Sequence, residues 1–381
     1  MKKIRWVAVF LIWLLLPIST YASELEAGEE QQDIQQGLLD EFEFGELESY
    51  LDELLPEEKI GFLDMVEQLI SGDMPLSFQS IWEVICNRFA YEWRHTRASV
   101  IGILILVILA ALFHNFSGVL KQSQISEIGF FVLYLLLIST CLESFRVISD
   151  SVSTGLSSLL GFLQILSPVY FLAVGIATGS STPVAFYTMI LPLIYMVELV
   201  IHSILIPLVQ MYLMVRILNH LSPEGYLSKF GELLKTVLVW SLRVLLGAVM
   251  GMNLVQGLLN PAIDSVKRSV LTRGGEAIPV IGNLVGGTAE VVLGTAKLIQ
   301  NGIGAAGAII CVIICLAPVI EMFVVMLLYK LTAALIQPIS DKRIVGCISS
   351  VADGAELLLR ILLTSAILFL ITIAMVANAT G

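Results

Sequence analysis

Long apolar runs, each able to form a membrane-crossing helix, make up most of the chain after Ala98. A helix needs about 20 predominantly apolar residues to cross a bilayer. Seven runs reach this length: 98–120, 125–147, 155–177, 183–218, 233–259, 308–335 and 355–377. Most of them are separated by short polar or charged segments. The pattern predicts an all-α, polytopic helical membrane protein in which residues 98–381 form a transmembrane domain of about seven spans.

The run from Pro183 to Leu218 leaves the number of spans open. It is longer than one span needs and contains Pro192 and Pro207. It could form one long tilted helix, or two short helices broken near Glu198 to Pro207. With seven spans and an extracytoplasmic N-terminal region, the C-terminus and the basic residues from Lys267 to Arg273 would be cytoplasmic, as the positive-inside bias favours.

The first 23 residues have the pattern of a cleaved secretory signal peptide. Lys2, Lys3 and Arg5 precede an apolar core, and residues 20–22 (Thr-Tyr-Ala) form a small-residue cleavage pattern. Such a segment directs export and is then removed. An uncleaved anchor is the alternative, and both place the following region outside the cytoplasm.

Residues 24–97 are expected to form an acidic extracytoplasmic region with short amphipathic helices. Between Glu24 and Asp73 the chain has 17 acidic residues and one base, Lys59. Two apolar stripes at helical spacing run through this acidic background: Leu47, Leu51, Leu54 and Leu55, then Phe62, Met65, Val66, Leu69 and Ile70. They predict two small helices that rest on the membrane domain, and their acidic faces could bind a basic partner.

Composition narrows the functional class. The chain is 57% hydrophobic and only 14% charged, with a mean hydropathy of +0.90, which excludes an ordinary soluble domain. An acidic head followed by a mildly basic body argues against nucleic-acid binding. Cys311 and Cys315 share a helical face but lie in a wholly apolar run, so we interpret them as packing residues rather than as metal ligands.

A glycine-rich stretch at residues 273–307 lies between two apolar runs and has two interpretations. It could be a flexible amphipathic connector on the membrane surface, or an element packed inside the bundle. Glycines at i+4 spacing on a helix allow another backbone to approach closely. The candidate helix-packing positions are Gly247, Gly251, Gly282, Gly286 and Gly294. The packed interpretation predicts that Gly286→Leu impairs assembly and that Gly302→Leu is milder.

Ionisable residues inside apolar runs are the candidate functional groups, because each needs a partner or an aqueous cavity at bilayer depth. Glu198 and His202 are four residues apart on one helical face, and they could bridge helices or line a conduit. Glu321 follows Pro318 and is expected to pair with a base such as Arg243 or Arg216. The candidate intramembrane polar residues are Glu198, His202, Arg243, Glu290 and Glu321.

Several long segments resemble the stage III sporulation protein AE family of endospore-forming bacteria. They are residues 166–187, 221–269, the glycine-rich stretch and residues 337–354. The similarity covers the chain from about Ala98 to its end, whereas the acidic head is similar only in character. The resemblance implies a membrane component of a mother-cell complex that joins the forespore through a channel. The implied partners are ring-forming membrane proteins and a secretion-type ATPase.

Three functions follow as hypotheses. The first is a non-enzymatic membrane subunit of such a channel complex, located in the mother-cell membrane and without a cofactor or metal. The second is a stand-alone secondary transporter, since proline-containing helices with buried Glu and His are typical of transporters. The third is an intramembrane enzyme, which is disfavoured because the sequence has no nucleotide-binding loop and no nucleophile–base arrangement.

Overall fold

The computed structural model describes residues 35–39, 42–55, 61–72, 78–117, 123–178, 192–221, 225–275 and 282–379. The signal peptide expected at residues 1–23 lies outside these ranges. The helices are α3 (Gly45–Leu54), α4 (Phe62–Ile70), α5 (Phe78–Ser117), α6 (Ser123–Thr178), η2 (Ile201–Leu205), α8 (Ile206–Leu221), α9 (Ser228–Gly275), α10 (Gly282–Ile336) and α11 (Lys342–Ala379).

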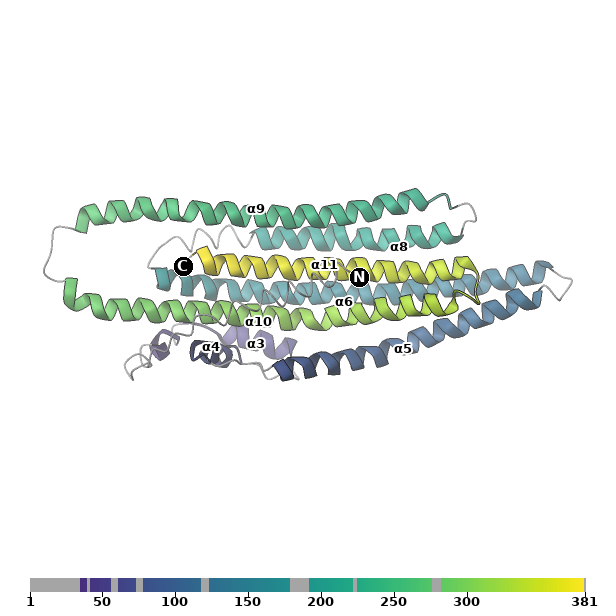
Figure 1. The fold of residues 1–381 in the computed structure, drawn as a ribbon, viewed down its shortest axis with the longest axis horizontal. Coiled ribbons are helices and arrows are strands. Elements are labelled where there is room, and N and C mark those ends of the chain that lie inside the picture. The colour runs from purple at the N-terminus through teal and green to yellow at the C-terminus, as the bar shows by residue number, and fades with distance from the viewer. Residues whose placement is uncertain are drawn as a thin grey trace.

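The long helices lie side by side in an elongated bundle (Figure 1). Helix α11 is at its centre and packs on α6, α8, α9 and α10. Helix α9 forms one edge, against α8 and α11, while α5 forms the opposite edge, against α6 and α10. The small helices α3 and α4 pack on α6 and α10 respectively.

The two spans expected at residues 125–147 and 155–177 form one continuous helix, α6. The segment between them is rich in serine and threonine. It contains no proline, and Ser149, Ser151 and Ser153 hydrogen-bond to side chains of neighbouring helices. Because these hydroxyls have partners inside the bundle, the chain has no need to turn here.

The described part of the run at residues 183–218 is also helical throughout. Residues 192–200 are helical, η2 continues them, and α8 follows through Pro207. The structure therefore shows one helix rather than two short ones in the described part. Similarly, the glycine-rich stretch from Gly282 onward is the first part of α10 and continues without a break into the expected span at residues 308–335.

Six helices are long and apolar enough to cross a membrane in the part of the chain that the structure describes: Ile85–Leu112, Phe131–Ala177, Pro192–His220, Ser228–Gly251, Leu293–Ile336 and Lys342–Ala374. The 47-residue and 44-residue stretches among them are more than twice the length that one bilayer requires. Both helices must therefore either tilt strongly or extend beyond the membrane.

The connections between helices define two ends of the bundle (Figure 1). At one end, which we call the hairpin end, α5 meets α6, α8 meets α9 and α10 meets α11. At the other, which we call the head end, lie α3 and α4, the end of α9 and the end of α11. Since α6 is one helix, the stretch from Lys267 to Arg273 lies at the head end and not opposite to it. This location differs from the seven-span expectation, which put these basic residues on the cytoplasmic side, opposite the acidic head.

The head is held on the bundle by the apolar stripes expected from the sequence. Leu47, Leu51, Phe62, Met65 and Val66 are buried. Acidic residues of the same two helices are exposed: Glu46, Asp52, Glu53, Asp64 and Glu67. An acidic helix packed along α6 and α10 is incompatible with hydrocarbon around that part of the bundle.

Single contacts fix the position of each head helix. The Tyr50 hydroxyl of α3 donates a hydrogen bond to the backbone oxygen of Ser158 at 2.9 Å, and its ring lies directly over Gly161 of α6. Burial, and then the charge of Glu53, raise the pKa of Tyr50 above its ordinary value. On the other side of the head, Ile70 of α4 lies against Gly302 of α10.

Candidate functional site

Glu198 and His202 lie on a helix that widens into the π-helix η2 over Ile201–Leu205. Single π-helical turns within α-helices frequently occur at functional sites. Both side chains line the same small cavity of about 10 Å³, together with Ser157 of α6. This volume is comparable to that of a single water molecule, so the site has no room for a larger solute in this state.

The partner of His202 is a serine on the neighbouring helix. Its Nδ1 lies 3.0 Å from Oγ of Ser153 on α6, and among the described residues no ion pair joins it to Glu198. A second contact between the same helices follows at Gln210, whose side-chain amide donates to Ser149 at 3.0 Å. Of the predicted polar pair, His202 therefore joins this helix to α6.

Glu321 has a different partner from the one expected. Ser151 of α6 donates a hydrogen bond to its carboxylate at 2.5 Å. The expected pairing with Arg243 or Arg216 is wrong within the described residues. Arg243 is exposed on α9, which packs on α8 and α11, and Arg216 of α8 lies against Gly231 of α9. The serine stripe of α6 thus supplies the polar partner that Glu321 needs at this depth.

A charged group joins α10 to α11 and was not found from the sequence. The ammonium of Lys330 lies 2.6 Å from Oε2 of Glu356, and the guanidinium of Arg360 lies 2.6 Å from Oε1 of the same carboxylate. All three side chains are partly exposed, between 25% and 47%. The i,i+4 spacing of Glu356 and Arg360 is the signal that could have revealed half of this group.

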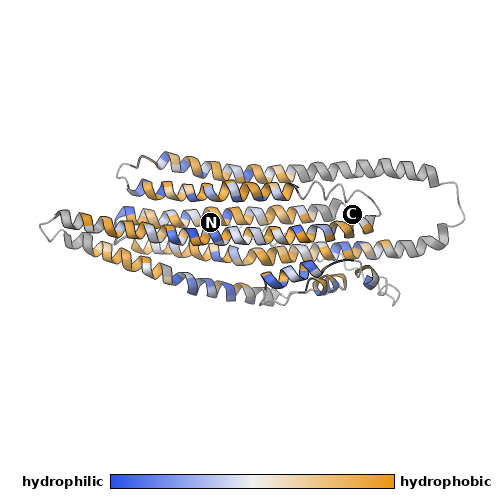
Figure 2. Cartoon of the chain, turned by 180° about the vertical axis from the view of Figure 1, so that it is seen from behind, coloured by the Kyte–Doolittle hydropathy of each residue, from blue (hydrophilic) through white to orange (hydrophobic). Residues whose placement is uncertain are grey.

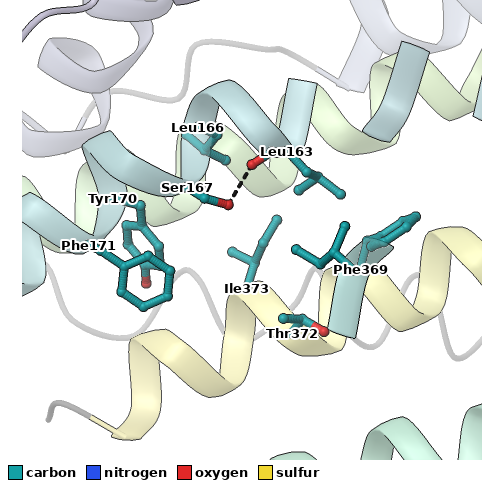
Figure 3. A pocket seen from close by; sticks show the side chains of 9 residues that line it. Leu163, Leu166, Ser167, Tyr170, Phe171, Phe369, Thr372 and Ile373 are labelled. Atoms are coloured by element: carbon teal, nitrogen blue, oxygen red, sulfur yellow. Dashed lines mark hydrogen bonds between the residues drawn. The ribbon is translucent and has the colours of Figure 1, made fainter. Parts of the chain in front are cut away.

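A second cavity, of about 30 Å³, lies nearer the head end between α6, α11 and the helix at residues 192–200. Figure 3 shows that its visible lining is almost wholly apolar, with Tyr170 and Phe171 at one side and Phe369 at the other. The Ser167 hydroxyl beside it donates to the backbone oxygen of Leu163 at 2.5 Å. This cavity offers no arrangement of polar groups for a specific ligand.

The cysteines behave as packing residues. Cys141, Cys311, Cys315 and Cys347 are buried, whereas Cys86 is exposed, and all five are free thiols. Within the ranges that the structure describes, no group of three or more His, Cys, Asp or Glu side chains is placed to hold a metal ion.

Three of the candidate packing glycines do not pack on any part of the chain whose side chains the structure describes. A methyl group built on Gly247, Gly251 or Gly294 would meet no atom within 4 Å. Gly282 and Gly286 lie in the first turns of α10, but they and Glu290 are outside the residues whose side-chain surroundings the structure describes. In the i+4 row on α10, Gly294 is the glycine whose surroundings the structure describes, and no neighbouring helix covers it there.

Other glycines, missed by the i+4 pattern, are the ones that tight packing requires. A methyl group on Gly307 would lie 2.6 Å from Leu166, one on Gly304 2.9 Å from Tyr170, and one on Gly302 2.9 Å from Ile70. Separations this short force a neighbour to move. Because Gly302 lies directly under the head helix α4, a leucine there must displace side chains of that helix. Whether Gly302→Leu is milder than Gly286→Leu stays a prediction, since the surroundings of Gly286 lie outside the described residues.

Comparison with known proteins assigns the chain to a family. The family model described as stage III sporulation protein AE matches residues 60–380. The stage III sporulation protein AE of Bacillus subtilis (strain 168) is 24% identical over 330 residues, which are 86% of this chain and 81% of that protein. No solved structure matches the chain. The family match and the six candidate membrane-spanning helices both fit a sporulation protein of the membrane. The chain belongs to the stage III sporulation protein AE family.

Proposed function

We propose that this chain is a non-enzymatic membrane subunit of a transenvelope channel complex that connects mother cell and forespore. Its membership of the sporulation family supports the process, and the six apolar helices support the location in a membrane. The observation that carries the proposal is the position of the head. Its two acidic helices pack along α6 and α10, far from the hairpin end (Figure 1).

The position of the head separates the bundle into two parts. A bilayer accounts for about 20 residues of each long helix. The apolar stretches of α6 and α10 are 47 and 44 residues long, and the head helices cover their parts near Gly161 and Gly302. We place this covered part outside the membrane, as a stem that projects from the mother-cell membrane toward the forespore.

The exposed acidic face of the head is the proposed docking surface for another subunit. The head helices expose Glu46, Asp52, Glu53, Asp64 and Glu67, which favours a basic partner. Ring-forming membrane proteins of the same complex fit this position. A secretion-type ATPase would act from the cytoplasmic side, at the hairpin end, and would supply the energy that this chain does not.

Gly302→Leu should release the head and weaken the recovery of partner proteins. A leucine at this position must displace Ile70 and Val66, which hold α4 on α10. The measurement is co-isolation of the full-length chain from sporulating cells, with identification of the partners. We expect normal membrane levels, faster proteolysis of the head and a several-fold loss of partners.

Gly102→Leu is the matched control, because a methyl group on Gly102 of α5 would meet no atom within 4 Å. It should leave both proteolysis and partner recovery unchanged. A released head with full partner recovery would contradict the docking role. Recovery of no other sporulation protein, even with the unmodified chain, would contradict the proposed complex.

A stand-alone secondary transporter is the second candidate, and the π-helix η2 favours it. Glu198 and His202 at such a helix could relay protons or bind a small cation. The chain, purified alone and placed in liposomes, would then move a solute without partners. A requirement for partner proteins in the same assay would favour the channel complex.

A further inference from the structure

The bundle has charged side chains in the middle of two opposite faces. On α6, the rear triad consists of Glu143, Arg146 and Asp150, which recur at helical spacing and are all exposed. The side chains of Arg146 and Asp150 are 75% and 70% exposed, and their mutual distance is 3.9 Å. Glu143 makes no ion pair within the described part of the chain.

The front triad consists of Lys330, Glu356 and Arg360, described above. Helix α11 lies in front of α6 in Figure 1, and Figure 2 shows the same bundle from behind. On α6, Phe145 faces α11, because it lies against Gly354. At 100° per residue, Glu143 and Asp150 are turned by about 160° and about 140° away from Phe145, and Arg146 by about 100°. The rear triad therefore lies on the side of α6 that is turned away from α11.

The first charges of the two triads lie at a similar height along the bundle. Helices α6 and α10 run antiparallel, and Ser151 is bonded to Glu321. Lys330 follows Glu321 by nine residues, which places it opposite the position nine residues before Ser151. At a rise of about 1.5 Å per residue, Lys330 therefore lies within about one helical turn in height of Glu143.

The other charges also match in height. Helices α6 and α11 run parallel, and Gly354 lies level with Phe145. Glu356 follows Gly354 by two residues and Arg360 by six. By the same rise, each lies within about one helical turn in height of one member of the rear triad: Glu356 of Arg146, and Arg360 of Asp150.

The two triads are therefore complementary in sign as well as in height. In order along the bundle, the rear triad is negative, positive and negative, whereas the front triad is positive, negative and positive. Apolar side chains surround them: Val147 is exposed beside the rear triad, and Leu327 and Leu331 beside the front one. Charges among lipid-facing apolar residues are costly unless they are paired.

We propose that copies of this chain associate front to rear, so that the front triad of one copy pairs with the rear triad of the next. All copies in a membrane share one orientation, and a sideways translation brings the opposite charges together without inversion. Such a heterologous contact uses two different faces and leads to a ring if the rotation closes. The interface does not depend on the proposed channel function, although a ring of copies would suit it.

Cysteine cross-linking between two differently tagged copies tests this arrangement. One copy carries Glu143→Cys and the other Lys330→Cys, in chains whose five native cysteines are replaced by alanine. In membranes treated with a short bifunctional maleimide, we expect a cross-linked dimer that carries both tags. Two copies that both carry Glu143→Cys should cross-link at least about tenfold less, because a front-to-rear contact keeps identical positions apart.

Lys229→Cys is the control partner for Glu143→Cys, since Lys229 is 88% exposed but lies outside both triads. Cross-links from this pair equal to those of the proposed pair would overturn the proposal, as would absence of a cross-link from the proposed pair. The cross-linking experiment measures neither sporulation nor the recovery of partner proteins. If copies cross-link but the co-isolation experiment recovers no other sporulation protein, the channel complex is rejected and the front-to-rear contact stands.

Charge reversal provides an independent test. Glu143→Lys and Lys330→Glu, each alone, should lower the oligomeric fraction in mild detergent about tenfold, and the double variant should restore it. Glu83→Lys, at an exposed site on α5 outside both triads, should have no effect. Thermal denaturation shows whether the double variant is folded. If it is folded but its oligomeric fraction does not recover, the proposed pairing is overturned.

Discussion

Gly307→Leu should disrupt the packing of α6 on α10. A methyl group on Gly307 would lie 2.6 Å from Cδ2 of Leu166, and Leu166 is only 2% exposed, so it has little room to move. Overpacking of such a site typically costs about 1–3 kcal/mol. We expect lower thermal stability in detergent and a severe loss of sporulation efficiency.

The same helix supplies the matched control. Gly294→Leu adds the same side chain, but a methyl group there would meet no atom within 4 Å. It should leave the thermal stability unchanged to within about 0.5 kcal/mol, as is usual for surface substitutions. Equal destabilisation by both substitutions would contradict the packing of α10 described above.

Glu356→Leu should have the second-largest effect, because it leaves Lys330 and Arg360 as neighbouring like charges. The carboxylate bonds both bases at 2.6 Å. Charge-assisted hydrogen bonds contribute about 1.5–3 kcal/mol when they are buried, and the partial exposure here lowers this to about 1–2 kcal/mol. The measurement is thermal unfolding of the purified full-length chain at fixed detergent and salt.

Glu232→Leu removes a comparable acid from a more exposed pair. Lys229 and Glu232 lie 3.0 Å apart with side chains that are 88% and 62% exposed. Loss of such a pair costs little, so we expect no measurable change. Destabilisation by Glu232→Leu as large as that by Glu356→Leu would show that the α10–α11 charges do not stabilise the bundle.

The fold class and the head helices could be predicted because each depends on local periodicity. Apolar runs of sufficient length predict spanning helices, and the stripes through Leu47 and Phe62 are buried as expected. Turns inside an apolar helical run depend instead on distant partners. Two separate spans were expected in α6, but the serines between them bond to His202, Gln210 and Glu321 in the bundle, and the helix continues.

Tight glycine packing and ion pairing were predicted less well for a related reason. The i+4 row identified glycines that share a face, but only the neighbouring helix decides whether that face is covered. Gly302, Gly304 and Gly307 are covered, whereas Gly294 is open. Likewise Glu321 needed a polar partner, as expected, but the order of helices in the bundle placed α6 beside it rather than α8 or α9.

The topology of the two bundle ends tests the account most directly. Single cysteines at Ser269, near the end of α9, and at Ile339, which is 63% exposed in the α10–α11 turn, should be probed in intact cells with a membrane-impermeant maleimide. The native cysteines are replaced by alanine in both chains. We predict that Ser269→Cys is labelled from outside, and that Ile339→Cys is labelled only after permeabilisation. Labelling of Ile339→Cys but not Ser269→Cys in intact cells would contradict an extracytoplasmic head end.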